Sequence, residues 1–177
     1  MTTVVKKPSD CSSDELTVFK QLLLAGDEVD NASLVARIQA AVCLVFHFTD
    51  NGRIVSISAL KTPGNSYRAK VFKQAKSSER ADDFPFELGW LFVVEEYRNR
   101  GLSRLLAERA LKLAEQKNVF AITRIDNVPM CRTNTRLCFQ QSGDPYRTTR
   151  KGRSYLLSLF IRCVGHSTIK RSLTVKK

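Results

Sequence analysis

The chain has 177 residues, 43% of them apolar, and it carries 29 lysines and arginines against 17 aspartates and glutamates. This length supports one α/β core and is too short for two full-sized domains. No segment approaches the roughly 20 consecutive apolar residues of a membrane-spanning helix, which excludes an integral membrane protein of that kind. The five cysteines lack metal-type spacing and the N-terminus lacks the apolar run of a signal peptide, so we expect a reduced, cytoplasmic protein without a metal site.

The N-terminal region predicts a strand followed by two helices. Residues 3–6 form a candidate short first strand. The segment 12–15, Ser-Ser-Asp-Glu, has the form of a capping box and predicts a helix over about 13–25. A second helix is expected to begin at Asn31 or Ser33.

A hairpin and a long polar connection follow. Two β-rich runs, 41–49 and 53–60, are joined by Asp-Asn-Gly at 50–52, which predicts an antiparallel pair. The connection over 61–84 is long enough to contain a helix, and its apolar positions permit a short one from Ser66.

An apolar strand pattern over 86–94 leads through a basic turn into an amphipathic helix over roughly 101–117. Gly101 can adopt backbone conformations closed to other residues and lets a phosphate approach the chain closely. The first N–H groups of such a helix are unpaired and lie at the positive end of its dipole. The segment therefore predicts a site for a ligand that carries phosphates. The buried face of this helix is predicted from Leu102, Leu105, Leu106, Ala110 and Leu113.

Three arginines, Arg98, Arg100 and Arg104, bracket the opening of this helix, where guanidinium groups can bind phosphate oxygens in pairs. Neither G-x-G-x-x-G nor G-x-x-x-x-G-K-[ST] is present, so the two better-known phosphate loops are excluded. An ordinary strand-to-helix turn with solvated arginines remains the alternative.

The C-terminal third predicts strand, helix and hairpin. Residues 119–125 are rich in apolar and β-branched side chains, and a helix over 127–139 follows, with Pro129 near its first turn. Residues 146–150 and 153–162 form a candidate hairpin around Lys-Gly.

Two of these segments resemble the motifs of the GNAT superfamily of acetyl-CoA-dependent N-acetyltransferases. The first motif of the family is V-x-P-x-x-[RQ]-x-x-G-x-[GA]; residues 93–103 fit it, with Glu95 in place of proline and Ser103 in place of the last small residue. The second is N-x-x-A-x-x-[LI]-Y-x-x-[LF]-G-F; residues 127–139 follow it in register, with Asn134 at the tyrosine and Cys138 at the glycine.

The resemblance implies an α/β fold in a single domain over 1–162: a mixed central β-sheet flanked by helices, whose splayed central strands bind the cofactor. Residues 163–177 are expected to be a basic, mobile tail. The implied reaction transfers the acetyl group of acetyl-CoA to a primary amine by direct attack in a ternary complex.

The resemblance also assigns the cofactor site. The pantetheine arm is expected to hydrogen-bond to the backbone of the central strand, and the diphosphate is expected to rest on the helix that follows it. The implied cofactor-binding residues are Leu91, Phe92, Val93, Arg98, Asn99, Arg100, Gly101, Leu102, Ser103, Arg104 and Asn127. Asn127 is also a candidate helix cap, and the two roles are compatible.

Two positions are candidates for catalysis, Glu87 and Asn134. Glu87 lies in an otherwise apolar run, so it is the candidate base for the acceptor's ammonium, the alternative being a solvated side chain at a strand start. Asn134 stands where the family often has a tyrosine that protonates the leaving thiolate, and asparagine cannot donate a proton in this way. The acid is therefore unassigned, with Tyr146 or Tyr155 as candidates.

The positive charge is concentrated near the C-terminus. Nine basic and no acidic residues follow Asp144, which leaves a net charge of +3 for residues 1–144. This pattern suits an acidic partner such as nucleic acid, or a solubilising tail. Two further functions stay open: a nucleic-acid- or protein-binding module with little turnover, and an acetyltransferase acting on an RNA-bound amine. The acceptor and the oligomeric state, a homodimer included, are not determined.

Overall fold

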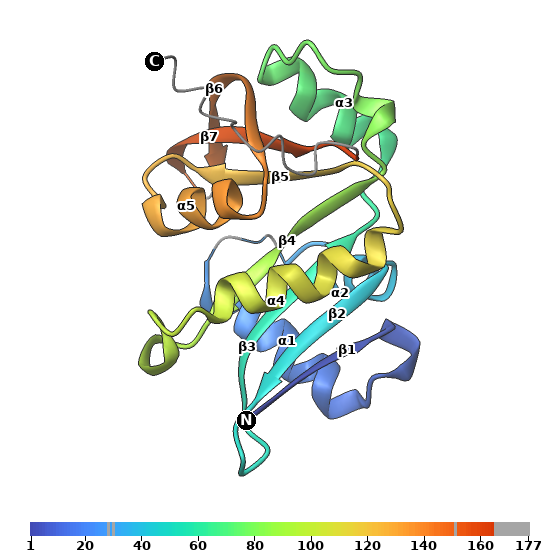
Figure 1. Cartoon of the computed structure of the whole chain (residues 1–177), viewed down its shortest axis with the longest axis vertical. Helices are drawn as coiled ribbons and strands as arrows, with labels where there is room; N and C mark the ends of the chain where they lie inside the picture. The colour runs from blue at the N-terminus through green and yellow to red at the C-terminus, as the bar shows by residue number, and fades with distance from the viewer. Residues whose placement is uncertain (28, 30, 151, 165–177) are drawn as a thin grey trace, which may run out of the picture.

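In a computed structural model that describes residues 1–27, 29, 31–150 and 152–164, one seven-stranded sheet runs through the molecule in the order β1-β2-β3-β4-β5-β7-β6 (Figure 1). Neighbouring strands are antiparallel except for β4 and β5, which are parallel, so the sheet is mixed as expected. The strands are β1 (Thr2–Lys6), β2 (Cys43–Phe48), β3 (Ile54–Lys61), β4 (Phe86–Val93), β5 (Val119–Arg124), β6 (Gln140–Arg150) and β7 (Arg153–Arg162).

Helices cover both faces of this sheet (Figure 1). One face carries α4, which lies across the central strands, and α5; α1 and α2 lie on the opposite face, and α3 stands at the end where β4 and β5 begin. The helices are α1 (Ser13–Ala25), α2 (Leu34–Gln39), α3 (Asn65–Gln74), α4 (Leu102–Leu111) and α5 (Val128–Arg136).

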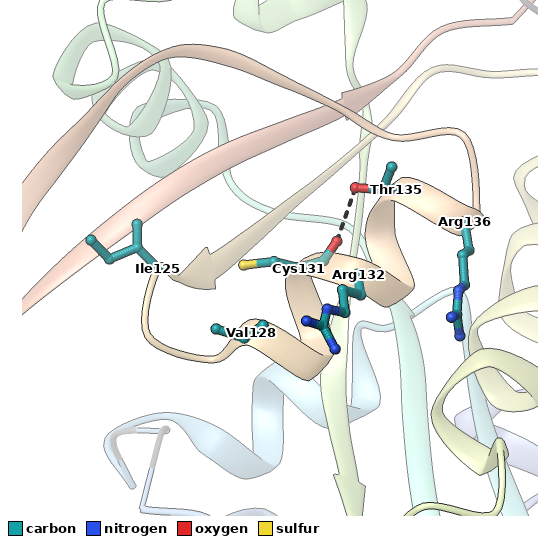
Figure 2. Close-up of a pocket in the computed structure, with 6 residues that line it drawn as sticks. All are labelled: Ile125, Val128, Cys131, Arg132, Thr135 and Arg136. Atoms are coloured by element: carbon teal, nitrogen blue, oxygen red, sulfur yellow. Dashed lines mark hydrogen bonds between the residues drawn. The ribbon is translucent and has the colours of Figure 1, made fainter.

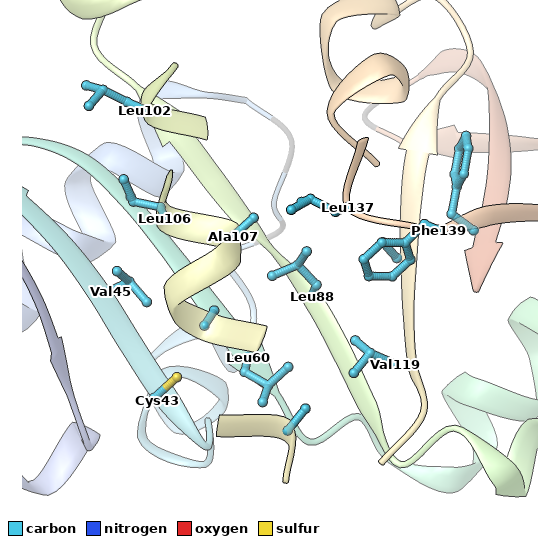
Figure 3. Packing of buried hydrophobic residues seen from close by; sticks show 14 of the residues in the cluster. Cys43, Val45, Leu60, Leu88, Leu102, Leu106, Ala107, Val119, Leu137 and Phe139 are labelled. Atoms are coloured by element: carbon cyan, nitrogen blue, oxygen red, sulfur yellow. The ribbon is translucent and has the colours of Figure 1, made fainter. Parts of the chain in front are cut away.

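The largest core cluster lies between α4 and the sheet. Leu106 and Ala107 of α4 are fully buried over Val45 and Leu88 (Figure 3). Complete burial of a leucine side chain contributes about 1.5–3 kcal/mol, so this packing fixes α4, and with it the turn that precedes it, against the central strands.

Local signals in the sequence predicted most elements correctly. The capping box is present at α1, where Ser12 accepts a hydrogen bond from the amide of Glu15 and Glu15 accepts one from Ser12. The hairpin turn at 50–52 joins β2 and β3, and α3 begins one residue before the expected Ser66.

Three boundaries differ from the prediction. The helix expected over 127–139 ends at Arg136. The helix expected over 101–117 ends as an α-helix at Leu111, and a 3-10 turn, Lys112–Ala114, follows and ends at Glu115, which has a left-handed φ of 47°. This change of pitch leaves Leu113 38% exposed, so its predicted burial is wrong. Strand β6 begins at Gln140, six residues earlier than expected, because a register shift between Ser142 and Tyr146 lets the strand resume after an irregularity.

Candidate functional site

The parallel strands β4 and β5 separate after their first two pairs. Phe86 pairs with Val119 and Glu87 with Phe120, and within the described chain no further pair joins these strands. Figure 1 shows the two strands running apart from this point, with α4 and α5 over the opening. The edge of β4 that faces the opening therefore has backbone N–H and C=O groups free for a ligand.

A β-bulge lies in β4 beside this gap. Gly89 pairs with Ala59 and Phe92 with Ile57, so two residues of β4, Trp90 and Leu91, oppose one residue of β3. Trp90 has a φ of 53°, a conformation that costs energy for a residue with a bulky side chain. The bulge turns the backbone of residues 91–93, the predicted site of the pantetheine arm, relative to the ordinary strand direction.

The opening of α4 has the geometry of an anion site. Gly101 has a φ of 76° and precedes the first helical residue, and no side chain caps this end. The amide of Leu105 bonds to the carbonyl of Gly101, so the preceding amides lie ahead of the first intrahelical bond. A Cβ at Gly101 would have no atom within 4 Å, so the space in front of these amides is open. Helix dipole and amides together favour a phosphate here.

Of the three predicted arginines, Arg98 and Arg100 precede α4 and Arg104 lies in its first turn. Arg98 Nε donates to the carbonyl of Val93 at 3.2 Å, which ties the turn to the end of β4. Arg100 donates to the carbonyl of Glu96 at 2.9 Å and lies 5.1 Å from the centre of the Tyr97 ring. Arg104 pairs with Glu108 at 2.7 Å on the exposed side of α4. Each guanidinium has five N–H donors, so these contacts leave further donors for phosphate oxygens.

Helix α5 borders the gap on the side of α4. Asn127 caps it, accepting a hydrogen bond from the amide of Met130 at 3.2 Å, as the sequence suggested. A shallow pocket of about 340 Å³ lies against α5 (Figure 2), lined by Ile125, Val128, Cys131, Arg132, Thr135 and Arg136.

Two arginines of this pocket, Arg132 and Arg136, were not predicted as site residues. Their spacing of four residues places both on one face of the helix, and Figure 2 shows both side chains extending from that face. This spacing is visible in the sequence and could have identified them.

Glu87 is buried and ion-paired. Its Oε1 lies 2.6 Å from Nζ of Lys61, the residue opposite it on β3, and the two side chains are 7% and 16% exposed. Lys61 Nζ also lies 5.2 Å from the centre of the Trp90 ring. The alternative of a solvated glutamate is therefore wrong. Lys61 was not predicted, because its distance of 26 positions from Glu87 carries no local signal.

Tyr146 on β6 lies close enough to Glu87 to feel its charge. Burial, and to a lesser extent the carboxylate of Glu87, raise the pKa of Tyr146 to about 12, so its hydroxyl keeps its proton at neutral pH. Tyr155, the other candidate acid, is half-buried on β7, with the guanidinium of Arg124 5.0 Å from its ring centre.

Asn134 belongs to α5 and is fully buried on the side of that helix that contacts β5. Its Nδ2 donates to Oγ1 of Thr123 at 2.9 Å, and its Oδ1 has no hydrogen-bond partner among the described residues. Glu87 precedes Leu88, which packs against the α4 face, so Glu87 points to the opposite face of the sheet. The structure therefore does not place the two predicted catalytic residues side by side. Met130 and Thr133 also depart from the second motif, at its alanine and its leucine or isoleucine.

A second pocket of about 450 Å³ lies between α1 and α2, lined by Leu16, Thr17, Lys20, Gln21, Leu24, Val35, Ile38 and Gln39. No group of three potential metal ligands occurs in the described chain, and none of its helices has the length and apolarity to cross a bilayer. All five cysteines are free. Of the tail expected over 163–177, only 163 and 164 are described, and the amide of Val164 donates to Oδ1 of Asn118 at 2.8 Å. The mobility predicted for the rest concerns residues outside the described ones.

Comparison with known proteins supports the motif assignment. The family model described as the acetyltransferase (GNAT) family matches residues 21–138, two thirds of the chain. No curated protein sequence matches the chain.

Several solved structures share the fold. A GNAT superfamily phosphinothricin acetyltransferase from Sinorhizobium meliloti, in complex with acetyl-CoA, has a TM-score of 0.68 at 14% identity, covering 97% of this chain and 93% of its own. NAA60 from Arabidopsis thaliana, also with acetyl-CoA, has a TM-score of 0.67 at 16% identity, with coverages of 92% and 100%. ElaA from Escherichia coli has a TM-score of 0.63 at 11% identity, with coverages of 90% and 99%.

Proposed function

Because this chain belongs to the GNAT family of acetyltransferases, we propose that it transfers the acetyl group of acetyl-CoA to a primary amine by direct attack in a ternary complex. The observation that carries the proposal is the separation of β4 from β5 after Glu87, in front of an uncapped helix opening at Gly101. Two structures that share the fold were solved with acetyl-CoA, which supports the same choice of acyl donor.

The residues present fit this donor. The unpaired edge of β4 at Leu91, Phe92 and Val93 offers backbone hydrogen bonds to an amide-containing arm. The amides of residues 101–104, with the turn of residues 98–100, offer a cradle for a diphosphate. Asn127 is proposed to contact the arm, because its side-chain amide has N–H donors to spare after capping α5. Arg132 and Arg136 add positive charge next to the same opening.

The groups of the protein itself are proposed to stabilise negative charge and to accept a proton during the reaction. Acetyl-CoA supplies the acetyl group as a thioester. A backbone N–H of β4 near the bulge is suited to stabilise negative charge on the carbonyl oxygen as the amine attacks. Glu87 is the proposed base, because an acceptor amine is protonated at neutral pH and must lose that proton before attack.

The leaving thiolate requires little help. Asn134 cannot protonate it, and its side chain is buried between α5 and β5. A thiol pKa near 8.5 makes the thiolate a tolerable leaving group. Of the two tyrosines, we prefer Tyr146 as hydrogen-bond donor, because the charge of Glu87 reaches it and it keeps its proton at neutral pH.

The test has two parts. Calorimetry should show binding of acetyl-CoA to the folded protein, and absence of any heat of association at millimolar ligand would contradict the proposal. Release of free CoA thiol is then measured with polyamines, amino acids, peptides and aminoacyl-tRNA as acceptors.

The panel also separates the alternatives. Tight binding without turnover on any acceptor would favour the binding module, a function compatible with the enclosed Asn134. Turnover on aminoacyl-tRNA alone would favour an RNA-bound amine, for which the exposed Arg147 and Arg153 of the terminal hairpin supply positive charge. The free thiols fit the reducing, cytoplasmic location that we propose.

A further inference from the structure

The ammonium of Lys61 lies against Gly89 of β4, two residues beyond the last pair of β4 with β5. A Cβ built on Gly89 would lie 3.0 Å from both Cε and Nζ of Lys61, so the end of the lysine runs directly over the glycine backbone. Glu87 is the last residue of β4 that pairs with β5, and Gly89 lies two residues after it. The amine therefore stands where the strands begin to part.

The surroundings of this amine are those that an acceptor amine requires. A carboxylate 2.6 Å away, Glu87 Oε1, can accept its proton. The face of an aromatic ring, Trp90, binds the cation before that proton is lost. The amine and the carboxylate are both more than four-fifths buried, which excludes most of the water that would compete for the acyl group.

We infer that Lys61 is itself an acceptor, so that the protein acetylates its own Lys61 Nζ from acetyl-CoA. This modification rests on the proposed function, since the same gap must deliver the acetyl group. It also defines the place of the external acceptor: in the resting protein the lysine occupies the position that the acceptor's ammonium takes.

The step balances without any further reactant. One proton passes from the ammonium to the Glu87 carboxylate, and the lone pair of Nζ attacks the thioester carbon. The N–C bond forms, the C–S bond breaks, and its electron pair leaves with the CoA sulfur. The second proton lost by the nitrogen goes to that thiolate, and Glu87 returns its own to solvent. The products are an Nζ-acetyl amide, CoA thiol and one proton.

A second ion-paired lysine provides a matched control. Lys6 Nζ lies 2.7 Å from Oε1 of Glu15, and its side chain is 30% exposed, but it belongs to β1 at the far edge of the sheet. Lys6 is thus a similarly paired and more accessible amine without the gap. Any acetylation that depends on solvent exposure alone should favour Lys6 over Lys61.

The experiment maps acetylation by mass spectrometry of peptides after incubation with acetyl-CoA, and in parallel with acetic anhydride, which needs no binding site. The ratio of modified Lys61 to modified Lys6 should be at least about tenfold higher with acetyl-CoA, because proximity raises the effective concentration of the bound thioester. The rate for Lys61 should not depend on protein concentration. Equal ratios with the two reagents would overturn the inference.

Two variants complete the test. Lys61→Arg keeps a cation beside Glu87 and should carry no label at position 61. Gly101→Glu should return the acetyl-CoA ratio to the anhydride value, whereas full labelling of Lys61 in this variant would refute delivery through the gap. Calorimetry separates the two proposals: if acetyl-CoA binds and Lys61 stays unmodified, only the self-acetylation is wrong, whereas no binding defeats the proposed function as well.

Discussion

The two sides of the gap between β4 and β5 are built in different ways. On the α4 side the site is mostly backbone: the unpaired edge of β4, the left-handed Gly101 and the first amides of α4. On the opposite side it is made of side chains from three strands, Lys61 of β3, Glu87 of β4 and Tyr146 of β6.

In the proposed function this difference separates cofactor binding from proton transfer. A backbone site depends on local conformation, so most side-chain changes near it should alter affinity only modestly. A side-chain cluster depends on the register of distant strands, so one substitution changes both the reaction and the packing. Substitutions on the two sides should therefore affect different measurements, and the following experiments test that separation.

The largest effect is expected on the rate of acetyl transfer, from a substitution in the cluster of Lys61, Glu87 and Tyr146. Glu87→Gln removes the proposed base, so the rate of acetyl transfer should fall by about 10² to 10⁴ while acetyl-CoA affinity stays unchanged. Glu15→Gln is the matched control, because it breaks the comparable pair with Lys6 at a distant site. Thermal unfolding is measured on both variants, since each leaves a lysine unpaired. Wild-type turnover by a folded Glu87→Gln protein would remove Glu87 from the mechanism.

A substitution at the opening of α4 should change the affinity for acetyl-CoA. Gly101→Glu forces a left-handed φ on a residue with a side chain and places a negative charge beside the proposed phosphates, so acetyl-CoA affinity measured by calorimetry should fall at least about tenfold. Gly52→Glu is the control: Gly52 has a similar φ of 80° and equally open surroundings, but it lies in the β2–β3 turn. Equal affinity of both variants and wild type would refute the assignment of the phosphate site.

Tyr146 should make stability depend on alkaline pH. Its folded pKa of about 12 lies above the unfolded value of 10, so between these values the unfolded chain loses the proton first. The free energy of unfolding should therefore be unaffected below pH 10 and then fall by up to about 1.4 kcal/mol per pH unit. Tyr146→Phe should lack this component. The free energy of unfolding is measured with denaturant from pH 9 to 12. The same dependence on pH in both proteins would argue against a buried phenol.

A smaller effect, on stability, is expected from the hydrogen bond between α5 and β5. Thr123→Val removes the acceptor of Asn134 Nδ2 and leaves a buried donor unpaired, which should lower the free energy of unfolding by about 1–3 kcal/mol. Thr135→Val serves for comparison, since Thr135 is exposed and the change there should be within about 0.5 kcal/mol. Urea unfolding measures both. Similar values for the two variants would show that the buried hydrogen bond contributes little.

The smallest effect is expected from the C-terminus. Removal of residues 165–177 takes away four basic residues that the proposed cofactor site does not use, so acetyl-CoA affinity should not change. Affinity for nucleic acid, measured at two salt concentrations, should fall if this segment binds an acidic partner. A loss of acetyl-CoA affinity on truncation would extend the cofactor site beyond the residues assigned to it.

The sequence predictions were most accurate for features that depend on neighbouring residues in the chain. The capping box of α1 and the turn at 50–52 involve neighbours in the chain, and both were predicted correctly. The opening of α4 at Gly101 belongs to the same class, because a glycine between a strand pattern and a helix pattern sets the local geometry. Leu113 was placed wrongly, since the periodicity of an α-helix does not reveal where the helix tightens.

The sequence by itself determined the order of elements, the family, and the position of the turn that we propose as the phosphate site, because these follow from periodicity and from a motif within a few consecutive residues. Only the tertiary structure decided that Glu87 pairs with Lys61, that the charge of Glu87 reaches Tyr146 and that Asn134 is buried between α5 and β5. Those contacts arise where strands align and helices pack, and residues that meet across a sheet leave no mark on the spacing between them in the chain.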